Sequence, residues 1–251
     1  DPDKPAAACV YLWARDARLV DAIEKARRNP RYLTDFTLPD AIRPTTSLSQ
    51  ALDDKELVIS VVPSHAVREV WGKGRELVRP DALIVSASKG IEVGSGKLVS
   101  EILMETLPRE MHDRLCFLSG PSFAKEIAER RPTAVSLAAR NETYAIAAQT
   151  LISSPEFRCY TTGDVVGVEL GGALKNVIAI AIGVADGLEA GLNSRAAVIT
   201  RGLAEITRLG VAMGANPVTF LGLSGVGDLV LTCTGDLSRN RRVGLEIGRG
   251  K

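Results

Sequence analysis

Short apolar runs alternate with longer amphipathic stretches along the first 160 residues, and this alternation constrains the fold more than any other feature. The clearest run, residues 57–62, is rich in β-branched side chains and ends at Pro63, so it predicts a buried strand. Similar runs predict a buried strand over 10–13 and further strands over 41–44, 82–86, 115–118 and 133–138. The intervening stretches predict helices over 16–28, 48–54, 64–77, 98–106 and 122–130, with Ser64 as the N-cap of the third. This order is typical of a doubly wound parallel sheet, in which ligands bind beyond the C-terminal ends of the strands.

The sequence changes character near residues 160–163, beyond which no convincing strand pattern appears. Residues 165–185 form a long apolar stretch of helical length, and further helices are predicted over 194–209 and 216–221. We therefore expect an α/β domain over residues 1–162, followed by an all-α domain over residues 163–251.

Charge and cysteine content argue against several classes of protein. A net charge of +1 over 251 residues gives no reason to expect binding to nucleic acid or to a membrane surface. No apolar run reaches membrane-spanning length without a glycine or a charge, so we expect no stable membrane insertion. The two histidines, His65 and His112, are far apart, and no metal site is expected. The cysteines are also widely spaced, which favours a reducing compartment such as the cytoplasm: Cys9, Cys116, Cys159 and Cys233.

Lys175 is the most unusual residue of the second half, because it lies inside the long apolar stretch. Gly171 and Gly172 precede it by one helical turn and leave room for a ligand or for a closely packed neighbour. A lysine there either extends to the surface or has a dedicated partner. In the second case burial would lower its pKa towards neutrality, which suits proton transfer.

Two later segments carry polar groups in patterns that suit a binding site. Asp228 follows a glycine-rich turn and could either cap the next helix or hold the ammonium group of Lys175. Ser238 is a predicted N-cap with Arg239 beside it, which is a favourable arrangement for a phosphate. The alternative for this last segment is a solvated basic helix surface.

Two loops at predicted strand ends are further candidates. Lys89 follows the strand over 82–86 and could reach a phosphate of a cofactor or a substrate. Gly120 follows the strand over 115–118, where a Gly-Pro turn leads into a helix and its free N–H groups. Glycine-rich turns also arise for purely steric reasons, so neither loop is decisive alone.

Taken together, seven segments stand in the order and spacing of one family: LWAR (12–15), VPSHAVRE (62–69), SKGIE (88–92), SGPSFA (119–124), ELGGALKNV (169–177), GDLVLTCT (227–234) and SRNR (238–241). The chain resembles the bacterial-type NAD(P)-dependent glycerol-3-phosphate dehydrogenases over nearly its whole length. The resemblance implies a Rossmann-like domain that binds NAD or NADP, followed by an all-α substrate domain. It also implies reduction of dihydroxyacetone phosphate to sn-glycerol 3-phosphate, which feeds glycerophospholipid synthesis, and a homodimer is one option for the assembly.

The resemblance also implies a role for individual residues. Lys175 matches the family's proton-transfer lysine, and Asp228 the residue that positions this lysine and the substrate hydroxyl. Both also match substrate positions, together with Lys89, Gly120, Ser122, Ser238, Arg239 and Asn240. Cofactor contacts are implied for Arg15, Lys89, Ala124 and Arg239. Because Arg15 ends a strand at the place where NAD-specific proteins usually carry an acid, we expect NADPH to be accepted, alongside NADH.

The chain departs from the family at both ends. The family opens with a strand and a G-x-G-x-x-G loop, and it continues beyond residue 251 with further helices. We therefore expect a fragment that binds cofactor weakly, and an inactive nucleotide-binding fragment is one alternative function. The other alternative is a β-hydroxyacid or ketopantoate-type dehydrogenase of the same architecture, against which the cluster over 238–240 argues.

Overall fold

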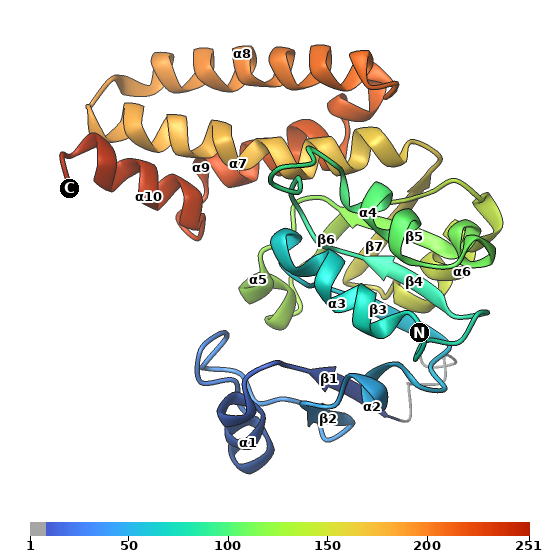
Figure 1. Cartoon of the computed structure of the whole chain (residues 1–251). Coiled ribbons are helices and arrows are strands. Elements are labelled where there is room, and N and C mark those ends of the chain that lie inside the picture. The colour runs from blue at the N-terminus through green and yellow to red at the C-terminus, as the bar shows by residue number, and fades with distance from the viewer. Residues whose placement is uncertain (1–8) are drawn as a thin grey trace.

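The first sheet of the protein is small and contains two parallel strands, β1 (Val10–Trp13) and β2 (Ile42–Thr45). The structure is a computed structural model that describes residues 9–251. Helix α1 (Ala17–Ala26) connects the two strands, and the side chain of Asp16 caps it by accepting a hydrogen bond from the backbone N–H of Arg18. Helix α2 (Leu48–Leu52) follows β2. These elements lie at the opposite end of the molecule from the long C-terminal helices (Figure 1).

The second sheet has five strands that lie in sequence order: β3 (Leu57–Ser60), β4 (Leu83–Ser86), β5 (Leu115–Ser119), β6 (Thr133–Ala139) and β7 (Phe157–Thr162). Neighbouring strands are parallel except for β5 and β6, which are antiparallel. The predicted doubly wound sheet is confirmed as a mostly parallel one, and the antiparallel pair of β5 and β6 is a departure from it. The connection between them, residues 120–132, contains one short helix, α5 (Ala124–Ala128). Parallel neighbours are usually joined by a longer crossover helix, whereas an antiparallel pair needs no crossover.

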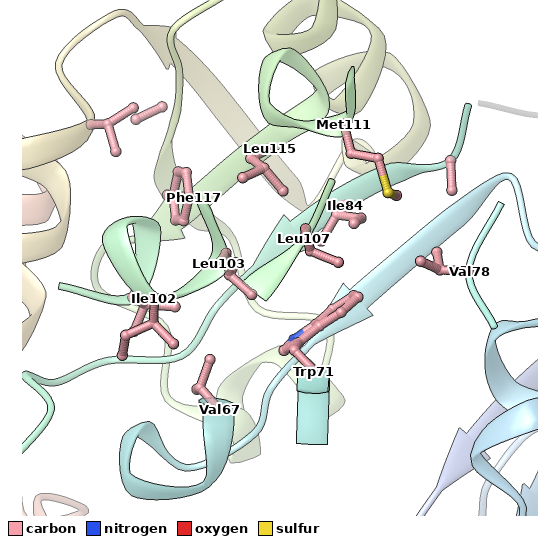
Figure 2. Packing of buried hydrophobic residues seen from close by; sticks show 14 of the residues in the cluster. Val67, Trp71, Val78, Ile84, Ile102, Leu103, Leu107, Met111, Leu115 and Phe117 are labelled. Atoms are coloured by element: carbon pink, nitrogen blue, oxygen red, sulfur yellow. The ribbon is translucent and has the colours of Figure 1, made fainter. Parts of the chain in front are cut away.

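Helices cover both faces of this second sheet. On one face, α3 (Val67–Gly74) and α4 (Val99–Thr106) pack with the turn η2 (Arg109–Arg114) over a core in which Trp71 lies among Ile84, Leu103 and Leu107 (Figure 2). The other face is covered by α6 (Glu142–Ile152), which the sequence did not predict, as it did not predict β7. Both elements lack a clear apolar period, so only their packing identifies them.

Three local expectations about this half are wrong. The side chains of Val10, Tyr11 and Leu12 were expected to be buried, but they are 38–46% exposed, and Ile59 of β3 is 53% exposed. Within residues 9–251, β1 pairs only with β2 and β3 only with β4, so fewer neighbours cover these strands. Ser64 is not an N-cap, because the chain first makes the 3-10 turn η1 (Ser64–Ala66) and α3 begins three residues later than predicted.

The C-terminal half is entirely helical, as predicted. It contains α7 (Val165–Gly187), α8 (Gly191–Ala212), the turns η3 (Pro217–Leu221) and η4 (Leu223–Gly227), α9 (Asp228–Thr234) and α10 (Arg239–Gly248). Helices α8 and α10 lie on either side of α7 (Figure 1). By length and composition α7 could cross a membrane, but 56% of its most apolar window is buried inside the fold. It is therefore the central helix of this half.

Two carboxylates attach α7 to its surroundings. Asp164 caps α7 through the backbone N–H of Gly167, and its other oxygen accepts hydrogen bonds from Asn216 N and Thr219 Oγ1. Glu169 is buried, and its Oε1 accepts a hydrogen bond at 2.9 Å from the backbone N–H of Ser100 in α4. Burial raises the pKa of Glu169 to about 7. Glu169 thus links the central helix to the sheet domain.

Candidate active site

Lys175 lies in the middle of α7, and only 8% of its surface is exposed. Its Nζ donates a hydrogen bond to Oδ1 of Asp228 and a second one, at 3.0 Å, to Oγ1 of Thr232. The alternative of a lysine that extends to the solvent is therefore wrong. Lys175 has a dedicated pair of partners on α9, more than fifty residues later in the chain.

Asp228 is the acceptor around which the site is arranged. It is 1% exposed and is the first residue of α9, where Gly227, which has no side chain, occupies the cap position. The helix-cap alternative is therefore wrong. While Oδ1 accepts from Lys175, Oδ2 accepts a hydrogen bond at 2.8 Å from Lys89. Lys89 also donates to the backbone oxygen of Gly120 at 3.2 Å. The loops after β4 and β5 thus meet α7 and α9 at one point.

Neighbouring elements can approach α7 closely because Gly171 and Gly172, one turn before Lys175, have no side chains. A Cβ on Gly171 would lie 2.2 Å from the carbonyl oxygen of Ser224, in the turn that precedes Asp228. A Cβ on Gly172 would lie 2.4 Å from Oγ of Ser119, at the end of β5. Both distances are shorter than any real carbon contact. At Gly171 the obstacle is backbone, so a side chain there would separate α7 from the turn before Asp228, whereas at Gly172 the obstacle is the hydroxyl of Ser119.

The environment of Lys175 lowers its pKa to about 8. Burial is the largest cause, because it disfavours the charged ammonium, and the positive charge of Lys89 adds to it. The carboxylate of Asp228 acts in the opposite direction. A lysine with such a pKa can both give and take a proton near neutral pH.

The start of α10 lies beside this group. Ser238 caps the helix, as predicted, and accepts a hydrogen bond from the backbone N–H of Arg241. Asn240 donates to Oδ1 of Asn176 at 2.7 Å, which places the first turn of α10 next to the residue that follows Lys175. Arg239, the first residue of α10, is exposed to solvent.

The remaining predicted positions lie at strand ends or beyond. Ser122 donates a hydrogen bond to the backbone oxygen of Gly120, and Ala124 begins α5 with its side chain exposed. Arg15 follows β1 and lies outside the group around Lys175. It is near Glu69 of α3, whose pKa is lowered first by Lys73 and to a smaller extent by Arg15. Within residues 9–251, no three metal-binding side chains come together.

Sequence reasoning missed two contacting residues, Thr232 and Asn176. Thr232 bonds Lys175 and also donates to the backbone oxygen of Asp228 at 2.6 Å. Its position four residues after Asp228, on the same helix face, is a signal that could have identified it. Asn176 is adjacent to Lys175 in sequence, but only the contact with Asn240 distinguishes it from other polar residues.

Comparison with known proteins identifies the family of this chain. Residues 4–145 match the family described as NAD-dependent glycerol-3-phosphate dehydrogenase N-terminus, and residues 164–251 match its C-terminus counterpart. Glycerol-3-phosphate dehydrogenase [NAD(P)+] from Myxococcus xanthus is 53% identical over 96% of this chain and 72% of the relative. The enzyme of that name from Leptospira biflexa is likewise 53% identical, over 96% and 73%.

A solved structure supports the same assignment. Glycerol-3-phosphate dehydrogenase from Coxiella burnetii superposes with a TM-score of 0.91 at 39% identity, covering 97% of this chain and 74% of that one. Both halves of the fold, the mostly parallel sheet and the helical part, are thereby matched. The resemblance found in the sequence motifs is confirmed. The chain belongs to the family of NAD(P)-dependent glycerol-3-phosphate dehydrogenases.

Proposed function

We propose that this protein reduces dihydroxyacetone phosphate to sn-glycerol 3-phosphate with NADPH or NADH, and that Lys175 is its proton donor. The observation that carries the proposal is the buried contact of Lys175 with Asp228. This acid–base pair lies where the loops after β4 and β5 meet the helical half. A product that feeds glycerophospholipid synthesis and a cytoplasmic location follow from the family.

Reduction of a ketone adds a hydride to the carbon and a proton to the oxygen. The nicotinamide cofactor supplies the hydride when it is bound. The ammonium group of Lys175 gives the proton to the substrate oxygen and becomes a neutral amine. Burial favours this neutral product, which is why the lowered pKa suits the step. Asp228 holds Nζ in place through the exchange, and the reverse reaction returns the proton to Lys175.

The phosphate of the substrate is assigned to the first turn of α10. Its free backbone N–H groups and helix dipole favour an anion, and Arg239 and Asn240 add side-chain donors. Ser238 supports this turn as its cap. The hydrogen bond between Asn240 and Asn176 supports the assignment, because it keeps the turn adjacent to Lys175. Lys89, Gly120 and Ser122 complete the substrate contacts on the sheet side, where Lys89 already bonds Asp228.

The residues present suit a dinucleotide cofactor. Arg15, Lys89 and Ala124 follow β1, β4 and β5, which is where α/β sheets bind such ligands, and the exposed start of α5 leaves Ala124 accessible. Arg239 would reach the cofactor from the helical side. We assign the 2′-phosphate of NADPH to Arg15, because guanidinium groups pair well with phosphates. The exposed position of Arg15 suits that role.

The chain divides into a cofactor domain up to residue 162 and a substrate domain from residue 163, in our proposal. The end of β7 at Thr162 and the start of α7 at Val165 support this boundary. Small molecules are the expected partners, and a homodimer is the assembly to examine first by light scattering.

The test follows the absorbance of NADPH when the protein is mixed with dihydroxyacetone phosphate, with ketopantoate as the competing substrate. Lys175→Ala should abolish turnover, whereas Lys125→Ala, which removes an exposed lysine, should not. The same assay is run on a version extended at both ends with flanking sequence of the Myxococcus xanthus relative, of which this chain covers 72%. No turnover of dihydroxyacetone phosphate by either version would refute the proposed reaction.

A further inference from the structure

Helices α7 and α10 pack against each other through glycines. Gly183 and Gly187 lie on α7, and Gly244 and Gly248 lie on α10. A spacing of four residues puts each pair on a single face of its helix. The two helices run side by side and in the same direction, from the centre of the molecule towards the C-terminus (Figure 1). We call these four residues the glycine seam.

On the α7 side of the seam, the obstacle to any side chain is the backbone of α10. A Cβ on Gly183 would lie 2.1 Å from the carbonyl oxygen of Arg241 and 2.8 Å from the Cα of Gly244. A Cβ on Gly187 would lie 2.6 Å from the carbonyl oxygen of Leu245. Backbone atoms cannot rotate away as a flexible side chain can, so the helices themselves would have to move.

The α10 side repeats this pattern with α7. A Cβ on Gly244 would lie 2.1 Å from the carbonyl oxygen of Ile180, and one on Gly248 would lie 2.4 Å from that of Val184. The contact is thus reciprocal, with each glycine facing a carbonyl oxygen of the other helix. Small residues at a four-residue spacing are what allows two helix backbones to approach this closely.

The seam continues the contact that holds the first turn of α10 beside Lys175. Asn240, four residues before Gly244, bonds Asn176, seven residues before Gly183. Arg241 bonds Asp186 of α7 through Nε at 2.9 Å, and Asp186 also accepts from Arg195 of α8. Side chains fix the beginning of α10, while the seam sets how far its axis lies from α7.

We propose that the four glycines of the seam are positioning residues, which set the distance between the phosphate-binding turn of α10 and the proton donor Lys175. They touch neither substrate nor cofactor and act through the backbone of α10. The inference rests on the proposed function, because it uses the phosphate site assigned there. It predicts that widening the seam harms recognition of the substrate phosphate and leaves proton transfer by Lys175 intact.

The size of the effect follows from the contact distances. Ordinary contacts of a Cβ begin at 3.4 Å, so an alanine at 183 or 244 requires the helices to separate by about 1 Å. A misplacement of about 1 Å can reduce catalysis by roughly 100-fold when the displaced group binds the substrate. The loss should be confined to substrates that carry the phosphate.

The experiment uses saturating NADPH, so that a changed cofactor contact of Arg239 does not enter the comparison. It compares two substrates of the full protein: dihydroxyacetone phosphate, and dihydroxyacetone, which has the same ketone and no phosphate. Gly183→Ala and Gly244→Ala should each lower kcat/KM for the phosphorylated substrate by about 100-fold, mainly through KM. For dihydroxyacetone, kcat/KM should change by less than about threefold. The matched control is Gly72→Ala, a helical glycine of α3 with nothing within 4 Å of its Cβ, which should leave both values unchanged.

Each outcome either supports or overturns the inference that the glycine seam positions the phosphate site. If kcat/KM falls equally for both substrates, or stays at the wild-type value for both, the seam does not position the phosphate site and the inference is wrong. Gly248→Ala covers the case in which the other variants do not fold, because it lies in the last turn of α10, where fraying absorbs part of the strain and leaves a smaller displacement of the helix. It should show the same selective loss at a smaller size, and an unchanged ratio would also overturn the inference. A wild-type protein that does not reduce dihydroxyacetone phosphate, either as this chain or in the extended version, would instead refute the proposed function.

Discussion

The buried position of Lys175 predicts that the rate of reduction falls at alkaline pH. As the proposed proton donor, Lys175 must carry its proton before the reaction, and burial and the neighbouring charge of Lys89 lower its pKa to about 8. The rate of reduction should therefore fall as the pH rises through 8. Oxidation of glycerol 3-phosphate needs the neutral amine, so its rate should rise over the same range.

The expected change is large enough to measure. With a pKa of about 8, the protonated fraction of Lys175 falls from roughly 90% at pH 7 to roughly 10% at pH 9. The reduction rate should fall by about ninefold over this interval if proton transfer limits it. A lysine with the ordinary value of 10.5 would remain almost fully protonated at pH 9, and the rate would hardly change. The substrate phosphate titrates near pH 6 and does not contribute to this limb.

The assay is a pH profile of kcat/KM in both directions, recorded between about pH 7 and 10. Two variants supply opposite controls. Lys89→Met removes a positive charge and should move the alkaline limb to higher pH, whereas Asp228→Asn removes a negative charge and should move it to lower pH. Both variants lose activity, so the quantity compared is the pH at which kcat/KM for reduction falls. A wild-type limb near pH 10.5, or two variants that shift it in the same direction, would refute the reasoning.

Three further predictions test other parts of the fold. Because the pKa of Glu169 is raised from 4.5 to about 7, wild type loses stability as the pH rises through 7. Glu169→Gln removes this loss, so the difference in unfolding free energy between pH 5 and pH 8, measured by chemical denaturation, should be about 2.5 kcal/mol smaller than in wild type. Arg15→Ala should weaken NADPH binding by roughly tenfold and leave NADH binding unchanged in a fluorescence titration, and equal losses for both cofactors would contradict the assignment. Ser238→Ala removes the cap of α10 and should destabilise the protein by about 1 kcal/mol in thermal unfolding, while a larger drop would mean that Ser238 does more than cap the helix.

Local patterns in the sequence were sufficient for the order of elements in most of the chain. Strand β4 and the helices α1, α4 and α7 were predicted within a few residues, because a buried strand or an amphipathic helix has a period that is visible in its own residues. The cap at Ser238 was predicted for the same reason, since a cap depends on the three residues that follow it. The motifs also identified Lys175, Asp228 and Arg239 as candidates before any contact was known.

The tertiary structure decided the questions that no local pattern contains. Whether Lys175 reaches the solvent or bonds Asp228 depends on a contact across 53 residues, and the direction of β6 is defined only by its pairing with β5 and β7. The glycine seam is readable as a spacing of four on each helix, but only packing reveals that the two spacings face each other. The sequence by itself determined most of the elements, though not α6 or β7, and it indicated which side chains could do chemistry. The fold decided which of those side chains meet, because burial and pairing depend on residues that are distant along the chain and close together in space.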